Sequence, residues 1–288
     1  MKLSGFTFIK NAVKYDFPFI ESVNSILPIC DEFIIVHGDS EDDTTKIIES
    51  INSPKIKVYN TVWNPELRKG GLILSEQTNI ALSKTTGDWC FYIQGDEVVH
   101  EKYLNNIIAG MKNNFDNQKV DGLLFNYLHF YGNYNYVATS RQWYRREIRI
   151  VRNNIGVQSF KDAQGFILNN RKLNVRQIDA SVYHYGWARP PQVMQNKVKY
   201  FHSLWHSKDW IDKNVPDNVD YDFSTMETIK AFEGTHPKVM ETRVKNQVSD
   251  FKMNNQKIKK GLIRILLDFI ERVSGYRVGE YKNYKIIK

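Results

Sequence analysis

Two short acidic segments follow apolar runs in the first hundred residues, and their residue types could bind a cation. Residues 37–44 (HGDSEDDT) come directly after the run 33–36, and residues 94–97 (QGDE) follow the run 89–93. Magnesium and manganese prefer carboxylate oxygens, and they commonly bridge one or two carboxylates to phosphates of a ligand. Asp and Ser in such turns also cap helices, and that role alone would explain residues 40–44. Because both clusters directly follow an apolar run, the two together favour a site for a cation and a phosphate-bearing ligand.

The elements that must position these clusters alternate between strand and helix. Apolar runs typical of buried strands occur at residues 5–9, 33–36, 56–59 and 89–93. Between them, helices with one apolar face are predicted at residues 17–27, 42–51 and 75–83. This alternation predicts an α/β fold with a doubly wound, mostly parallel sheet. Ligands of such sheets bind beyond the carboxyl ends of the strands, so we expect both acidic clusters to face one crevice.

The second half of the chain is less regular. Strands are predicted at 122–131 and 146–152, then loops to about residue 183, and a helix at 193–207. Residues 238–272 are basic and helical in pattern. Within residues 257–273, apolar side chains gather on one side of the predicted helix at Ile258, Leu262, Ile265, Leu266, Phe269 and Val273.

Charge and cysteine content narrow the class of protein. The 288 residues carry a net charge of +8, which suits a phosphate-bearing ligand, an anionic membrane or nucleic acid. No zinc-finger spacing, RNA-recognition aromatic motif or basic-region heptad occurs, so we expect no nucleic-acid partner. The two cysteines, Cys30 and Cys90, predict a reducing cytosol without a disulfide framework. No apolar run approaches the roughly 20 residues that span a bilayer, so we expect a cytoplasmic chain.

Three segments in the first half resemble glycosyltransferase family 2 and its GT-A relatives. Residues 33–44 resemble the family's strand followed by V-D-x-G-S-x-D-x-T, and residues 76–89 resemble its N-x-A-l…a-x-G-D-[WY] segment. Residues 94–97 occupy the place of the family's D-x-D-E motif. The resemblance covers roughly residues 4–190 and is strongest up to residue 100. It implies a GT-A fold, a nucleotide-diphosphate sugar donor, inverting transfer and Mn²⁺ or Mg²⁺ as cofactor.

The resemblance assigns donor-binding roles to residues of the two clusters. Asp39 and Asp43 would border the nucleotide pocket. Gln94 stands where the family has the first acid of D-x-D; its amide can bind a ribose hydroxyl, but it is a poor metal ligand. His37 replaces the acid that ends the second strand, so recognition of the base can differ from that of the family.

Four further residues complete the expected site. By resemblance, Asp96 and the late histidine His184 would hold the metal, although a histidine between tyrosines is more often a packing residue. Arg189 could clamp a phosphate through its guanidinium, or it could be a surface residue at a helix start. Asp162 follows an R-[LI]-[FV]-[RK]-like strand at 149–152, and the resemblance makes it the base that deprotonates the acceptor. It could equally be a loop acid.

We therefore expect a metal-dependent, inverting glycosyltransferase that acts on a carbohydrate or lipid-linked saccharide acceptor in surface polysaccharide or glycan synthesis. Its catalytic domain would span residues 1–235, with a nucleotide-binding half at about 1–100 and an acceptor half at about 101–235. Residues 236–288 would form a C-terminal helical extension that lies peripherally on the inner face of the membrane, docks on the domain or forms a homodimer contact. The alternatives are a non-catalytic carbohydrate- or nucleotide-binding module, and a sugar-nucleotidyltransferase. The latter normally begins with a Gly-rich phosphate loop, whereas residues 4–16 contain only Gly5.

Overall fold

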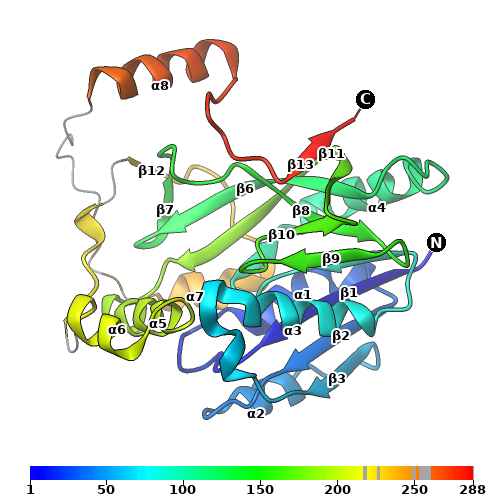
Figure 1. Cartoon of the computed structure of the whole chain (residues 1–288), viewed down its shortest axis with the longest axis horizontal. Coiled ribbons are helices and arrows are strands. Elements are labelled where there is room, and N and C mark those ends of the chain that lie inside the picture. The colour runs from blue at the N-terminus through cyan, green and yellow to red at the C-terminus, as the bar shows by residue number, and fades with distance from the viewer. Residues whose placement is uncertain (217–218, 226–227, 248, 250, 253–260, 288) are drawn as a thin grey trace.

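The first part of the chain alternates strand and helix as predicted (Figure 1). Its elements are β1 (Leu3–Ile9), α1 (Phe19–Ile26), η1 (Leu27–Ile29), β2 (Glu32–His37), α2 (Thr44–Glu49), β3 (Ile56–Asn60), η2 (Pro65–Gly71), α3 (Leu72–Ser83) and β4 (Trp89–Tyr92). β1 pairs in parallel with β2 and β4, and β2 pairs in parallel with β3. The whole of β2 is buried, which is why a continuous apolar run marks it in the sequence. The prediction of a parallel α/β half is confirmed.

The structure, a computed structural model, describes residues 1–216, 219–225, 228–247, 249, 251–252 and 261–287. Beyond β4 the elements are β5 (Glu97–Val99), η3 (Glu101–Tyr103), α4 (Leu104–Asn113), β6 (Gly122–Tyr131), β7 (Asn133–Ala138), β8 (Arg146–Arg152), β9 (Val157–Phe160), β10 (Gly165–Leu168), β11 (Arg171–Trp187), α5 (Pro191–Ser203), α6 (Lys208–Asn214), η4 (Phe223–Thr225), β12 (Ile229–Ala231), η5 (Lys238–Met240), α7 (Glu241–Asn246), α8 (Leu262–Ser274) and β13 (Tyr284–Ile286). The central sheet runs β3-β2-β1-β4-β8-β6-β11-β10-β9 and becomes mixed beyond β4.

The expectation of loops up to residue 183 is wrong. This stretch holds β9, β10 and most of β11, a strand of 17 residues. β11 pairs in parallel with β6 and antiparallel with β5, so its residues are ordered by partners distant in the sequence. Its last residues belong to the site described below.

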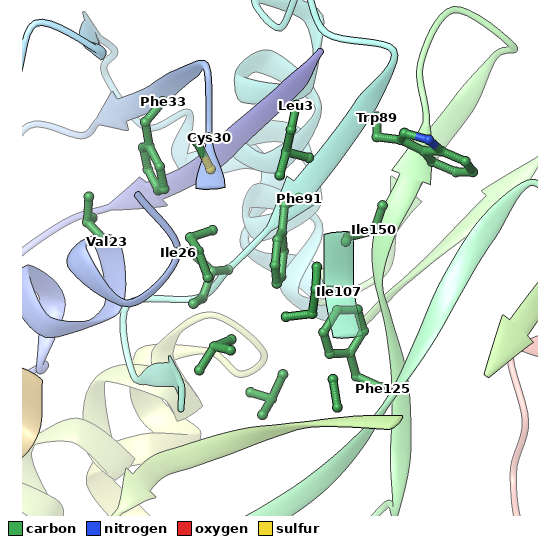
Figure 2. Close-up of a cluster of buried hydrophobic side chains, with 14 of the residues drawn as sticks. Leu3, Val23, Ile26, Cys30, Phe33, Trp89, Phe91, Ile107, Phe125 and Ile150 are labelled. Atoms are coloured by element: carbon green, nitrogen blue, oxygen red, sulfur yellow. The ribbon is translucent and has the colours of Figure 1, made fainter. Parts of the chain in front are cut away.

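Helices and hairpins cover both faces of the sheet. On one face Val23 and Ile26 of α1 and Ile107 of α4 pack with Phe33 and Phe91 of the sheet (Figure 2). The other face is covered by α3 together with the hairpin of β9 and β10. Covered on both faces, the sheet leaves the ends of its strands as the place for ligands.

A buried carboxylate fastens the start of the parallel strands. Glu32, the first residue of β2, accepts hydrogen bonds from Ser4 Oγ at 2.6 Å, Thr86 N at 2.7 Å and Lys57 Nζ at 2.7 Å. These bonds hold the pKa of Glu32 at about 2, although burial alone would raise it. This anchor lies at the opposite ends of the strands from the acidic clusters.

The segment predicted as a C-terminal helical extension, residues 236–288, contacts the rest of the chain at several points. Met240 is fully buried beside Tyr183 and Tyr185, and Arg243 forms an ion pair with Asp16 at 2.6 Å. β13 adds to β11 in parallel. Its α-helices among the described residues are α7 and α8, and residues 257–260 of the predicted helix lie outside the described residues.

α8 lies at the periphery of the fold (Figure 1), and its polar side contacts the body of the protein. Glu271 pairs with Arg141 at 2.6 Å and with Arg277 at 2.8 Å. The apolar side is solvent-exposed along the helix at Leu262, Ile263, Ile265, Leu266, Phe269 and Val273. Across the described residues, no helix has the length and apolar character needed to cross a membrane.

Candidate active site

A cleft of about 450 Å³ opens beyond the carboxyl ends of β1 and β4. It is bordered by residues that follow these strands, by the end of β11, by α5 and by the turn between β9 and β10. Its polar lining includes Lys10, Gln94, Asp96, Asp162, Gln164, His184 and Lys197. Aromatic rings make up much of the remaining wall, at Phe8, Phe17, Trp63, Trp143, Tyr144, Trp187, Tyr200, Phe201 and Trp205. Aromatic faces of this kind suit the apolar faces of sugar rings and nucleobases.

Asp96 and His184 lie next to each other at the base of the cleft. β5 pairs with β11 so that Glu97 is opposite His184, and the Tyr185 N–H donates to the Asp96 carbonyl at 2.8 Å. His184 Nε2 is 3.7 Å from Asp96 Oδ2. Gly186 makes this approach possible, because a Cβ there would lie 2.4 Å from His184 Nε2 and 2.7 Å from Asp96 Oδ2. The two predicted metal ligands are thus brought together.

A second histidine orients His184. His129 Nε2 lies 2.8 Å from the Tyr144 carbonyl oxygen, so Nε2 must donate. Burial lowers the pKa of His129 well below its ordinary value, so the ring is neutral and its Nδ1 accepts. His184 Nδ1, 3.0 Å away, is therefore the donor of that bond. The hydrogen-bond pattern leaves His184 Nε2 as the atom that faces Asp96.

Lys197 of α5 binds the same carboxylate. Its Nζ donates to Asp96 Oδ2 at 2.9 Å and to the Gly186 carbonyl at 2.8 Å. Burial, followed by the nearby Arg189, lowers the pKa of Lys197 to about 8 against the raising effect of Asp96. Burial would raise the pKa of Asp96, but Lys197 and His184 hold it well below 3.8. At neutral pH the pair is therefore an ammonium and a carboxylate.

Beside this group, a buried ion pair fixes the turn of residues 94–97. Arg149 donates to Glu97 through Nη2 at 2.7 Å and Nε at 2.9 Å, and both side chains are fully buried. The Tyr127 hydroxyl also donates to Glu97 at 2.8 Å. This bidentate pair keeps the neighbouring Asp96 in one orientation.

Asp162 lies in the turn between β9 and β10 and lines the same cleft. Lys161 and Ala163 on either side adopt left-handed backbone conformations, with φ of 55° and 61°. The Gln94 amide donates to the Ala163 carbonyl at 3.4 Å, which connects this turn to the end of β4. Gly71 packs against Asp162, since a Cβ at residue 71 would lie 3.1 Å from the Asp162 Cβ. Asp162 and Gln94 are therefore brought to one site.

The first acidic cluster divides into two parts. Asp39 forms an ion pair with the cleft residue Lys10 at 2.8 Å and accepts from the Trp63 N–H at 3.2 Å. Asp43 is exposed at the start of α2 and pairs with Lys46 at 2.7 Å. Asp39 thus adjoins the cleft, and Asp43 does not line it.

Arg189 is buried, with 2% of its surface exposed, and it does not line the cleft. Its Nη1 donates to the Tyr15 carbonyl, and its guanidinium lies over the Phe17 ring at 5.2 Å. The side chain fastens the loop after β1 to the end of β11. A direct phosphate clamp would need this guanidinium to reach the cleft, which these contacts do not favour.

The donor set around Asp96 fits a divalent cation poorly. The carboxylate oxygen that faces His184 already holds the Lys197 ammonium, and Gln94 supplies an amide where a second acid would stand. Within the described part of the chain, no group of three or more His, Cys, Asp or Glu side chains is arranged to hold a metal ion. A divalent cation on this oxygen would lie beside a buried ammonium, and like charges repel strongly where water is excluded.

Sequence reasoning missed Lys197. It stands on the same face of α5 as Met194 and Phe201, at a spacing of three and four residues. Lysine is almost never fully buried without a partner. A lysine on an apolar helical face was therefore a usable signal that a buried anion lies opposite it.

A family model for glycosyl transferase family 2 matches residues 18–175, more than half of the chain. The chain belongs to glycosyl transferase family 2. Membership in this family, together with the parallel first half, confirms the predicted GT-A fold class. No curated protein matches the chain.

Solved structures similar to this family 2 chain are distant. S. aureus TarS is 18% identical, with 70% of this chain and 39% of that chain covered and a TM-score of 0.42. TarS 1–349 in complex with UDP-GlcNAc is 18% identical over 71% of this chain and 66% of that chain, with a TM-score of 0.41. Glucosyl-3-phosphoglycerate synthase from Mycobacterium tuberculosis, in complex with Mn²⁺, UDP and phosphoglyceric acid, is 17% identical. That match covers 44% of this chain and 43% of that chain, with a TM-score of 0.31. The chain spans about two fifths to two thirds of the TarS chains.

Proposed function

We propose that this family 2 chain transfers a sugar from a nucleotide-diphosphate donor to a saccharide acceptor with inversion at the anomeric carbon. The observation that carries the proposal is the cleft at the strand ends, where two kinds of charged group share one lining. One part of it holds the charged group around Asp96, and another holds the carboxylate of Asp162. The first suits a diphosphate, and the second suits an acceptor hydroxyl.

In this proposal Asp162 is the general base. It takes the proton of the acceptor hydroxyl while that oxygen attacks the anomeric carbon from the face opposite the diphosphate. The bond between the anomeric carbon and the diphosphate oxygen breaks, and its electron pair leaves with the diphosphate. In the same proposal Gln94 hydrogen-bonds a hydroxyl of the donor ribose, and Asp39 with Lys10 borders the nucleotide.

The aromatic wall supports a carbohydrate ligand. Trp63 and Phe8 lie at one side of the cleft with ring centroids 6.0 Å apart, and Trp143 and Trp187 lie 5.6 Å apart at another. The first pair is close to Asp39 and suits the base. The second pair suits the acceptor.

The proposal is tested by incubating the chain with a panel of nucleotide-diphosphate sugars and saccharide acceptors, and by detecting product by mass spectrometry. Transfer from at least one donor is expected, with loss of transfer in Asp162→Asn. Binding of a nucleotide sugar without transfer or donor hydrolysis would instead indicate a non-catalytic module. Release of pyrophosphate from a nucleoside triphosphate and a sugar phosphate would indicate a nucleotidyltransferase.

We also propose that α8 lies on the cytoplasmic face of a membrane and that the acceptor is lipid-linked. The support is the orientation of this helix: its carboxylate Glu271 faces the protein, and its apolar side chains face solvent. Soluble proteins usually bury such a face, so an outward apolar stripe favours a partner. A homodimer contact is the alternative occupant.

A further inference from the structure

We infer that the Lys197 ammonium takes the place of the divalent cation at this site, so that the chain binds a nucleoside diphosphate without metal. The inference rests on the proposed function, because it concerns the diphosphate of the same donor. It departs from the expected metal site of Asp96 and His184.

Lys197 lies where a cation bound to Asp96 would lie. Its Nζ is within hydrogen-bond distance of Asp96 Oδ2 and of the Gly186 carbonyl, at 2.9 and 2.8 Å. An ammonium has three N–H donors, and these contacts use two of them. The residue lines the cleft, so the third donor is available to a ligand oxygen there.

Aromatic rings hold this cation in position. The Lys197 ammonium lies 5.1 Å from the Phe17 ring centroid and 5.4 Å from that of Phe201. Only 7% of the residue is exposed. A cation fixed in this way needs little rearrangement when a charged ligand arrives.

The local charge also suits an anion. Asp96 is the one carboxylate among the groups that act on Lys197, whereas both Lys197 and the buried Arg189 are cationic. Among Lys197, Arg189 and Asp96, positive charges outnumber negative charges by one near the base of the cleft. A diphosphate would neutralise this excess, and a divalent cation would increase it.

The chemical role is electrostatic. When the bond between the anomeric carbon and the diphosphate oxygen breaks, the electron pair goes to the leaving oxygen. The remaining Lys197 N–H stabilises the added negative charge by hydrogen bonding, and no proton need be transferred.

The test is calorimetric titration of the unaltered chain with UDP, GDP, ADP and CDP, in EDTA and in excess Mn²⁺. For the nucleotide that binds, we expect dissociation constants that agree within about threefold between the two conditions. Mn²⁺ alone, followed by electron paramagnetic resonance, is expected to show no tight site. Binding that requires Mn²⁺ would overturn the inference and leave the proposed function standing. Absence of binding in both conditions would contradict the proposed function itself.

The variant Lys197→Met removes the charge and keeps a chain of similar length. Because this variant loses a hydrogen bond from a charged group to the diphosphate, its affinity for the nucleoside diphosphate in EDTA should fall by about ten- to a hundredfold. The control Lys46→Met removes an exposed lysine on α2 and should bind as the unaltered chain does. Lys197→Arg should retain metal-free binding, because it keeps the positive charge. If the Met variant unfolds, the EDTA comparison on the unaltered chain still decides the question.

Discussion

A methyl group on Gly186 would come within 2.4 Å of His184 Nε2, so the two residues fit together only because one of them lacks a side chain. Gly186→Ala should push His184 and Asp96 apart and lower nucleoside diphosphate affinity by about tenfold or more, with smaller loss of stability. The measurements are calorimetry and thermal unfolding. Gly261→Ala is the control, since a Cβ there has nothing within 4 Å. Unchanged affinity in Gly186→Ala would place the diphosphate elsewhere.

Asp162→Asn should lower sugar transfer by about 10²–10⁴-fold and leave donor affinity nearly unchanged. The amide keeps the shape of the side chain but cannot accept the acceptor's proton. Transfer to acceptor is the quantity to measure, because donor hydrolysis need not use the same base. Asp43→Asn serves as the matched control on an exposed acid. Near-normal transfer by the Asp162 variant would move the search for the base to Glu147 and Asp179.

Asp39→Asn should weaken nucleoside diphosphate binding by about three- to tenfold. Its ion pair with Lys10 and its bond from the Trp63 N–H hold two cleft residues in place. Asp43 makes no such contact, so Asp43→Asn should bind like the unaltered chain. Equal losses in both variants would show that general charge around α2, rather than the Asp39 contacts, governs affinity.

Glu32→Gln should alter how stability depends on pH. The pKa of Glu32 is about 2 in the fold against an ordinary value of 4.5, so the native state stabilises the carboxylate. This stabilisation is fully present above pH 4.5 and is lost as the pH falls from 4.5 towards 2. Because Lys57 is half-exposed, solvent screening keeps the effect to about 1–2 kcal/mol. Urea unfolding of both proteins should show a stability difference that narrows below pH 4.5. A difference that stays constant down to pH 3 would contradict this assignment.

Leu266→Asp combined with Phe269→Asp should abolish sedimentation with anionic liposomes if α8 lies on a membrane. Both side chains are more than half exposed on the outward face, at 58% and 52%. Val62→Asp is the control, as it removes an exposed apolar side chain in the segment after β3, a strand that lies at the opposite end of the molecule from α8 in Figure 1. A chain that never sediments with liposomes, but loses dimers in the double variant by analytical ultracentrifugation, would show that a second copy covers this face.

The sequence allowed the first half of the fold to be predicted because its signals are local. The buried run of β2 and the apolar face of α1 are each visible within about ten residues. β11 could not be found in this way, since its polar and apolar residues acquire their order from pairing with β5 and β6. The turns that carry Asp96 and Asp162 were identified by resemblance to the family. The contact of Lys197 with Asp96 spans 101 residues of sequence, and only the tertiary packing of α5 reveals it.

The left-handed backbone conformations of the two residues beside Asp162 affect how much conformational entropy is lost when an acceptor binds. Lys161 and Ala163 hold positive φ angles that non-glycine residues seldom adopt, at a cost of roughly 1–3 kcal/mol each. Buried Ala163 is held there through its carbonyl, which accepts from Gln94, and through its N–H, which donates to Phe160. The chain therefore meets this cost when it folds, before any acceptor is present. An acceptor that reaches Asp162 does not have to order the turn, so more of its binding energy remains for aligning the attacking hydroxyl.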